Sequence, residues 1–152
     1  MNYISLGTNC HPAGNLKFLK LKQKSLPFDW LLIRQDKVFE YINDLINTNF
    51  KNFTKNLTYN YRQKVISKNY DYAEFFHYDL IKNKVLNRPN DENKNLIEMM
   101  NRRVKRFMDI IKGDGKVVFV CCINHDKLNK KIYDDMVLFE KNSNIKCNYK
   151  VL

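Results

Sequence analysis

Near its C-terminal end the chain holds an unbroken apolar run, VVFVCCI, from Val117 to Ile123. The run is too short to cross a bilayer as a helix, which takes about 20 apolar residues. A strand with one face in water alternates apolar and polar residues, and this run does not alternate. Strands that are apolar at every position are typical of parallel sheets covered by helices on both faces. The run therefore predicts an α/β protein with a buried parallel strand.

The segments around this run show strand-like and helix-like patterns in turn. We expect strands or strand-like pairs at 3–6, 57–72, 75–79 and 149–152. Apolar residues that recur every three or four positions predict helices over 11–21, 37–46, 96–112 and 130–141. Asp36 is expected to cap the second helix, and Gly113 to end the third in a left-handed conformation. This order predicts a single α/β domain over residues 1–152, with a mainly parallel sheet flanked by helices in Rossmann-like layers.

The composition is that of a globular protein of 152 residues, long enough to fold without disulfides or a metal. The start of the chain, MNYISLG, is not a secretory signal, and no segment is long and apolar enough to span a membrane. The four cysteines form no C-x-x-C pair and no zinc-finger spacing; they are Cys10, Cys121, Cys122 and Cys147. We therefore expect a cytoplasmic protein with free thiols, without a metal or cofactor.

The formal net charge of +11 points first to a nucleic acid or another anionic surface. However, Lys outnumbers Arg by 21 to 6, and Arg is the residue that most often reads bases. Asn also occurs 21 times. Lys and Asn are both favoured by AT-rich codons, so codon bias accounts for much of the charge. A specific nucleic-acid site is therefore not expected.

Cys10 is the first candidate for chemistry, because it follows the expected first strand and begins a helix. Ligands bind at the carboxyl ends of strands in α/β sheets. The positive end of a helix dipole favours a thiolate. Gly7 lets the backbone approach closely, and backbone N–H groups around Asn9 could stabilise an oxyanion. The alternative is a small buried thiol that serves only packing.

A cysteine nucleophile needs a base nearby, and the chain has three histidines. His11 is a poor partner, since successive side chains on a helix diverge from Cys10. His77 shares a face with Asp79 if their segment is extended. His125 follows the apolar run, and parallel strands leave a sheet at the same edge, so it could also approach Cys10. Each histidine could equally be a polar loop residue.

Two further groups could take part in binding. The segment PFDW at 27–30 holds the only tryptophan, Trp30, which could simply cover the sheet edge. Asp29 beside it could orient a base or a substrate hydroxyl. Arg103 and Arg106 lie three residues apart on one helix, where they could clamp a phosphate or carboxylate. An exposed charged face is the usual reason for such a run.

The segments ISLGTNCHPA (4–13) and SLPFDW (25–30) together resemble the SLGxxC…PFDW signature of a bacterial and viral domain family of unknown function, the papain-like cysteine peptidases. A Phe-His segment with Asp79, an arginine-bearing helix and the apolar strand follow in the family's order. The resemblance covers most of the chain and implies that Cys10 is the nucleophile and His77 the base. Asp29 and Asp79 are then the candidate orienting groups. Tyr78 separates His77 from the acid here, and the chain ends soon after the strand, so we expect a compact or truncated member.

We therefore expect a cysteine-dependent hydrolase that acts on a peptide or a small molecule. Its substrate-binding candidates are Asn9, Trp30, Arg103, Arg106 and His125. The alternative is a noncatalytic or differently catalytic α/β domain that binds an anion such as a sugar phosphate or nucleotide. General polyanion binding by the lysine-rich surface is a third possibility. The apolar strand favours Rossmann-like layers over the antiparallel barrel of a papain fold.

Overall fold

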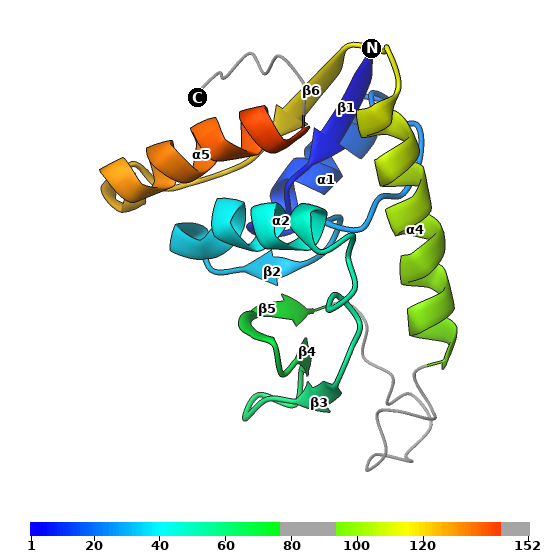
Figure 1. The fold of residues 1–152 in the computed structure, drawn as a ribbon, viewed down its shortest axis with the longest axis vertical. Helices are drawn as coiled ribbons and strands as arrows, with labels where there is room; N and C mark the ends of the chain where they lie inside the picture. The colour runs from blue at the N-terminus through cyan, green and yellow to red at the C-terminus, as the bar shows by residue number, and fades with distance from the viewer. Residues whose placement is uncertain (77–93, 144–152) are drawn as a thin grey trace.

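The computed structural model describes residues 1–76 and 94–143, and it confirms an α/β fold (Figure 1). In the described part of the chain there are two sheets. A parallel pair consists of β1 (Asn2–Ser5) and β6 (Val117–Val120). An antiparallel sheet in the order β2-β5-β4-β3 consists of β2 (Leu32–Ile33), β3 (Leu57–Tyr59), β4 (Val65–Ser67) and β5 (Tyr70–Phe75). The described residues also form four α-helices: α1 (His11–Phe18), α2 (Val38–Asn47), α4 (Lys94–Lys112) and α5 (Lys130–Ser143).

The prediction of a mainly parallel sheet is wrong. Strand β6 covers only the first four residues of the apolar run, and it pairs with β1 from Asn2 opposite Val117 to Ser5 opposite Val120. Val117 is buried and the next three residues are half-buried, so the run is not buried on both faces. The strand is apolar because a helix packs against it, and not because it has a strand neighbour on each edge. Phe119, for example, packs edge-on against Phe139 of α5 at 4.8 Å between ring centroids.

The hairpin expected over 57–72 is present and belongs to a larger antiparallel meander, β3-β4-β5. A bulge between Ile66 and Ser67 shifts its register. The two-residue strand β2 was not predicted, because a segment this short shows no periodicity. Its Leu32 pairs with Glu74 of β5. The strand expected at 149–152 lies outside the described residues.

The four predicted helices are all present, but their ends differ from the predictions. Helix α1 ends at Phe18 rather than at residue 21. Asp36 does not cap α2: it lies in a short 3-10 helix, η1 (Gln35–Lys37), and its carboxylate accepts a hydrogen bond from Arg34 Nε at 2.8 Å. Gly113 does not end α4 in a left-handed conformation, since Gly7 alone of the described glycines has a positive φ.

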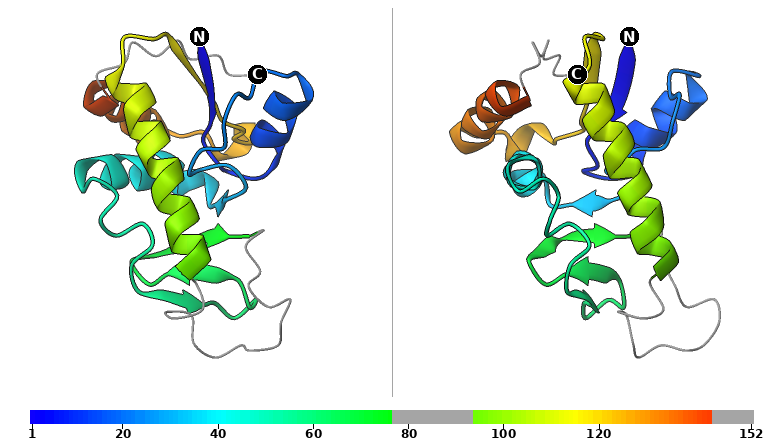
Figure 2. Two further views of the ribbon diagram at one scale, coloured as in Figure 1. Left: turned by 90° about the vertical axis from the view of Figure 1, so that its right-hand side faces the viewer. Right: turned by 45° about the vertical axis from the view of Figure 1, so that its right-hand side comes forward.

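Helix α4 runs alongside both sheets (Figure 2). Its buried residues belong to one hydrophobic cluster that also contains residues of β1, β5 and β6; they are Leu96, Met100, Phe107 and Ile111. Phe107 packs edge-on against Phe28 at 5.2 Å and against Phe50 at 5.7 Å. The long helix therefore stabilises the two sheets as parts of one core.

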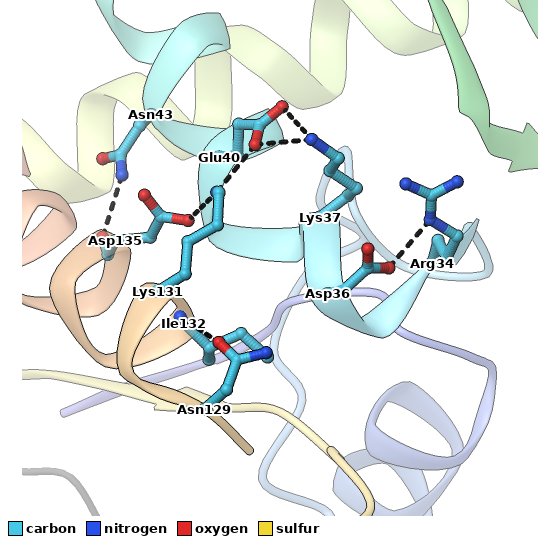
Figure 3. Close-up of polar contacts among 9 residues, drawn as sticks. All are labelled: Arg34, Asp36, Lys37, Glu40, Asn43, Asn129, Lys131, Ile132 and Asp135. Carbon is cyan, nitrogen blue, oxygen red and sulfur yellow. Dashed lines mark hydrogen bonds and ion pairs between the residues drawn. The ribbon is translucent and has the colours of Figure 1, made fainter. Parts of the chain in front are cut away.

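Helix α5 packs against α2 through a polar network (Figure 3). Lys131 Nζ donates hydrogen bonds to Glu40 at 2.8 Å and to Asp135 at 2.6 Å. Lys37 Nζ also donates to Glu40, at 2.8 Å. Asn43 is buried, and its side-chain amide donates to the Asp135 carbonyl at 2.9 Å. These contacts fix the position of α5 beside the core.

The network predicts a specific acid sensitivity. The hydrogen bond from Lys131, followed by that from Lys37, lowers the pKa of Glu40 below its ordinary value of 4.5. Such a group stabilises the fold above its unfolded pKa, and this contribution is lost as the pH falls through the folded value. We expect Glu40→Gln to lower the free energy of unfolding by no more than about 1 kcal/mol at pH 7, since the side chains are partly exposed. We also expect the variant to lose less stability than wild type below pH 4.5.

Urea unfolding at neutral and acidic pH measures this effect. Glu98→Gln, at an exposed position of α4, is the matched control. A Glu40→Gln variant whose stability falls with acid as steeply as that of wild type would contradict the prediction.

Candidate functional site

Strand β1 leads into a loop, residues 6–10, at the carboxyl edge of the parallel pair. The Leu6 N–H donates to the Val120 carbonyl at 2.9 Å. The Thr8 hydroxyl then donates to the carbonyl of Cys122, beyond the end of β6, at 2.6 Å. This confirms the expectation that both strands leave the sheet at one edge. The segment after β6 is thus tied to the loop that carries Cys10.

Gly7 gives this loop its shape. Its φ is +59°, and a Cβ atom added there would lie 2.5 Å from the backbone oxygen of Phe28. Its own carbonyl accepts a hydrogen bond from the Ile33 N–H of β2 at 3.1 Å. Only glycine tolerates both the left-handed conformation and the contact. The segments SLG and PFDW, far apart in sequence, therefore touch directly.

Cys10 is the N-cap residue of α1, and its carbonyl accepts the first helical hydrogen bond, from the Gly14 N–H at 2.9 Å. Its thiol is half-buried and makes no hydrogen bond to the described residues. The His11 N–H is occupied by the side-chain oxygen of Asn9 at 2.9 Å. Pro12, in the first turn, has no N–H to satisfy. The N–H groups of Asn9 and Cys10 are thus the candidates for an oxyanion site.

The structure does not test the pairing of Cys10 with His77, because His77 and Asp79 lie outside the described residues. His125 begins the short 3-10 helix η3 (His125–Lys127) and is exposed. No hydrogen bond joins it to Cys10 among the described contacts. The residue before it, Asn124, donates its N–H to the Gln35 side chain at 2.9 Å, which holds this segment against η1.

Asp29 is buried and paired. Its Oδ2 accepts from Lys22 Nζ at 2.6 Å and from the Leu26 N–H at 2.8 Å. The Lys22 side chain is only 11% exposed, and its Nζ also lies 5.0 Å from the centroid of the Trp30 ring. Trp30 has a φ of +65°, a conformation that bulky residues rarely adopt. Sequence reasoning missed Lys22, since nothing in its sequence neighbourhood marks it among the other lysines.

The two arginines lie on α4. Arg103 is half-buried and Arg106 exposed. Arg106 reaches the Ser25 carbonyl at 3.5 Å. It also lines a cavity of about 250 Å³ together with Asn2, at the start of β1. Cys10 lies beyond the other end of that strand, so the structure does not bring Arg106 to the Cys10 loop.

A second cavity, of about 560 Å³, lies beside the Cys10 loop. Of the predicted site residues that the structure describes, only Asn9 lines it. Sequence reasoning missed its buried acid, Glu74, because β5 also carries the exposed Asp71 and the sequence does not show which of the two acids is buried. Within residues 1–76 and 94–143, no three His, Cys, Asp or Glu side chains gather as a metal site. Nor do the helices there include one that is long and apolar enough to cross a membrane.

A comparison with protein-family models matches residues 1–148 to the family described as "Putative papain-like cysteine peptidase (DUF1796)". No curated protein and no solved structure is similar enough to the chain to count as a match.

The Gly7 contact predicts opposite effects for two similar substitutions. Gly7→Ala forces a side chain into the left-handed conformation and against the Phe28 carbonyl. We expect it to lower the free energy of unfolding by more than about 2 kcal/mol. Gly14→Ala, inside α1 with no atom within 4 Å of the added Cβ, is expected to raise it by about 0.5–1 kcal/mol. Urea unfolding of both variants tests this, and effects of the same sign would contradict it.

The buried ion pair yields a second prediction. Lys22→Met leaves Asp29 without its cation, and we expect a loss of about 3–5 kcal/mol in the free energy of unfolding. Lys22→Met/Asp29→Asn is expected to recover part of the loss, because no uncompensated charge remains. Lys17→Met, at an exposed position of α1, is the control. If the Lys22 variant is no less stable than the Lys17 variant, Asp29 does not depend on this pair.

Proposed function

Because the chain belongs to the family of putative papain-like cysteine peptidases, we propose that it is a cysteine-dependent hydrolase of peptide bonds, with Cys10 as its nucleophile and His77 as its base. The observation that carries this proposal is the position of Cys10. Its half-buried thiol lies at the N-terminus of α1, where the helix dipole favours a thiolate. Gly7 and Thr8 hold the preceding loop at the carboxyl edge of β1 and β6.

The proposed reaction begins with transfer of the Cys10 proton to His77. The thiolate attacks the peptide carbonyl carbon, and the N–H groups of Asn9 and Cys10 stabilise the oxyanion. Collapse of the tetrahedral species breaks the C–N bond, and His77 returns its proton to the departing amine. Water, deprotonated by His77, then hydrolyses the thioester and restores the thiol.

The orienting group for His77 in this proposal is Asp79 rather than Asp29. Asp29 Oδ2 is already engaged by Lys22 and by the Leu26 N–H, so its charge stabilises its own loop. His125 is the alternative base. The bond from Thr8 to the Cys122 carbonyl favours this alternative, since it ties the segment before His125 to the Cys10 loop.

Thiol reactivity tests the nucleophile. We expect iodoacetamide at pH 6.5 to alkylate Cys10 at least about tenfold faster than the exposed Cys122, because only Cys10 lies at a helix N-terminus. Cys121 is the negative control: desolvation raises the pKa of its thiol to about 12, so it remains a poorly reactive thiol. Peptide mapping by mass spectrometry gives the three rates. Equal rates at Cys10 and Cys122 would show that Cys10 is not activated.

Hydrolysis of a fluorogenic peptide library identifies the base. Cys10→Ser is expected to abolish turnover and Cys122→Ser to leave it unchanged. Loss of the true base lowers the rate by about 10²–10⁴-fold, so His77→Gln and His125→Gln should differ sharply. If neither histidine variant loses activity, the proposed Cys-His mechanism is wrong.

A further inference from the structure

The cavity beside the Cys10 loop is built on the outer face of the antiparallel sheet. Its floor follows one row across three strands, in which Glu74 of β5 pairs with Leu32 on one side and Ile66 on the other. Thr8 and Asn9 form one wall. The turn between β3 and β4 forms the opposite wall, with residues 60–62. A volume of about 560 Å³ is within the range of pockets that bind small ligands.

Glu74 is the unusual residue of this floor, because it is a carboxylate that is only 6% exposed. Its Oε1 accepts hydrogen bonds from the Asn60 amide, at 2.7 Å, and from the Arg62 guanidinium. Its Oε2 is buried without a hydrogen-bond partner among the described residues. Buried carboxylate oxygens are normally hydrogen-bonded, and leaving one unpaired is costly. One oxygen of this carboxylate is therefore left for a donor that the described residues do not supply.

The charges around the cavity favour a cationic donor. The guanidinium of Arg34 is paired with Asp36 at 2.8 Å (Figure 3), and that of Arg62 is paired with Glu74. Asp71 lines the cavity, is exposed, and makes no ion pair within the described part of the chain. Two carboxylates, Glu74 and Asp71, thus accompany the two guanidiniums that line the cavity, although the chain as a whole has 27 basic and 16 acidic residues. The lining is neutral, and since both guanidiniums are already paired, Asp71 and the second oxygen of Glu74 remain for a cationic donor.

The aromatic ring of Tyr72, which lines the cavity, also favours a cation. The ring of Tyr72 lines the cavity and already has two cations near it, Arg34 at 5.9 Å and Lys37 Nζ at 5.8 Å from its centroid. Lys37 is paired with Glu40, so it adds no net charge. Burial raises the pKa of Tyr72 to about 12, so the phenol is neutral at physiological pH. Aromatic faces attract cations, and this wall can accept the stem and head of a long basic side chain.

We propose that this cavity is a specificity pocket for a lysine or arginine side chain of the peptide substrate, whose N–H group donates to Oε2 of Glu74. Thr8 and Asn9 precede Cys10 directly in the chain, so a peptide anchored in the pocket passes beside the thiol. The pocket's role in cleavage rests on the proposed function. Binding of the basic side chain does not, and it can be measured without catalysis.

Binding is measured by fluorescence anisotropy with the Cys10→Ser protein and labelled hexapeptides that differ at one position: lysine, arginine, norleucine or glutamate. We expect the lysine and arginine peptides to bind at least about tenfold more tightly than the norleucine peptide, as a charge-assisted hydrogen bond allows. Glu74→Gln is expected to abolish that preference. Its amide oxygen can still accept from Asn60 and Arg62, but its NH₂ group replaces the acceptor Oε2. Glu98→Gln, with the same charge change on α4, should retain the preference.

Asp71→Asn provides a second variant in case Glu74→Gln fails to fold, which a thermal melt would reveal. Asp71 is exposed, so the fold should tolerate the change, and the preference for lysine should fall about two- to threefold as one charge near the site is removed. Equal binding of the lysine and norleucine peptides would overturn the pocket. So would a preference that survives both Glu74→Gln and Asp71→Asn in folded protein.

Cleavage profiling separates this inference from the proposed function. If wild-type protein cleaves peptides without a basic residue near the broken bond, the hydrolase stands and the pocket is wrong. If Cys10 is unreactive and nothing is cleaved, but lysine peptides still bind through Glu74, the pocket stands and the proposed function is wrong.

Discussion

Gly7 lies directly against the backbone carbonyl of Phe28, and the rest of the structure depends on this contact. Through Gly7, the chain leaving the parallel pair makes a hydrogen bond to Ile33 of the antiparallel sheet. Through Phe28, the same contact reaches the aromatic core, where one ring packs against Tyr41, Phe50, Phe53 and Phe107. Two small sheets that would be marginal alone therefore share one hydrophobic core. The Cys10 loop takes its position from this junction.

Buried acids are the second constraint on a chain with so large an excess of lysine. Asp29 is neutralised by a lysine that is itself almost buried, and this pair closes the loop that carries Phe28. Glu74 differs, since its Oε2 is buried without a hydrogen-bond partner among the described residues. A carboxylate that leaves no buried oxygen unpaired stabilises the fold, whereas one with an unpaired buried oxygen beside a cavity has capacity left for a ligand. This difference separates a structural acid from a candidate recognition group, although both are buried to a similar degree.

The apolar run from Val117 to Ile123 shows how much of the fold a local sequence pattern can predict. Its lack of alternation correctly predicted a parallel strand, since β6 pairs with β1 in parallel, but β6 is only partly buried. It did not predict how many strands the sheet contains, because a strand covered by α5 and by the aromatic core is as apolar as one flanked by strands. The antiparallel sheet became visible only partly, as a hairpin pattern. Its strand β2 is too short for any periodicity to appear.

By itself the sequence determined the helices, the parallel pairing, the position of Cys10 at the start of a helix, and the family. Each of these depends on residues close together in the chain or on a linear motif. Only the tertiary structure decided that SLG touches PFDW, that Lys22 neutralises Asp29, and that Glu74 faces a cavity beside the Cys10 loop. These contacts join residues that belong to no common periodic pattern or sequence motif, so the sequence does not show that they meet. They form because burial brings the residues together, and a buried carboxylate must then find a donor or remain unpaired.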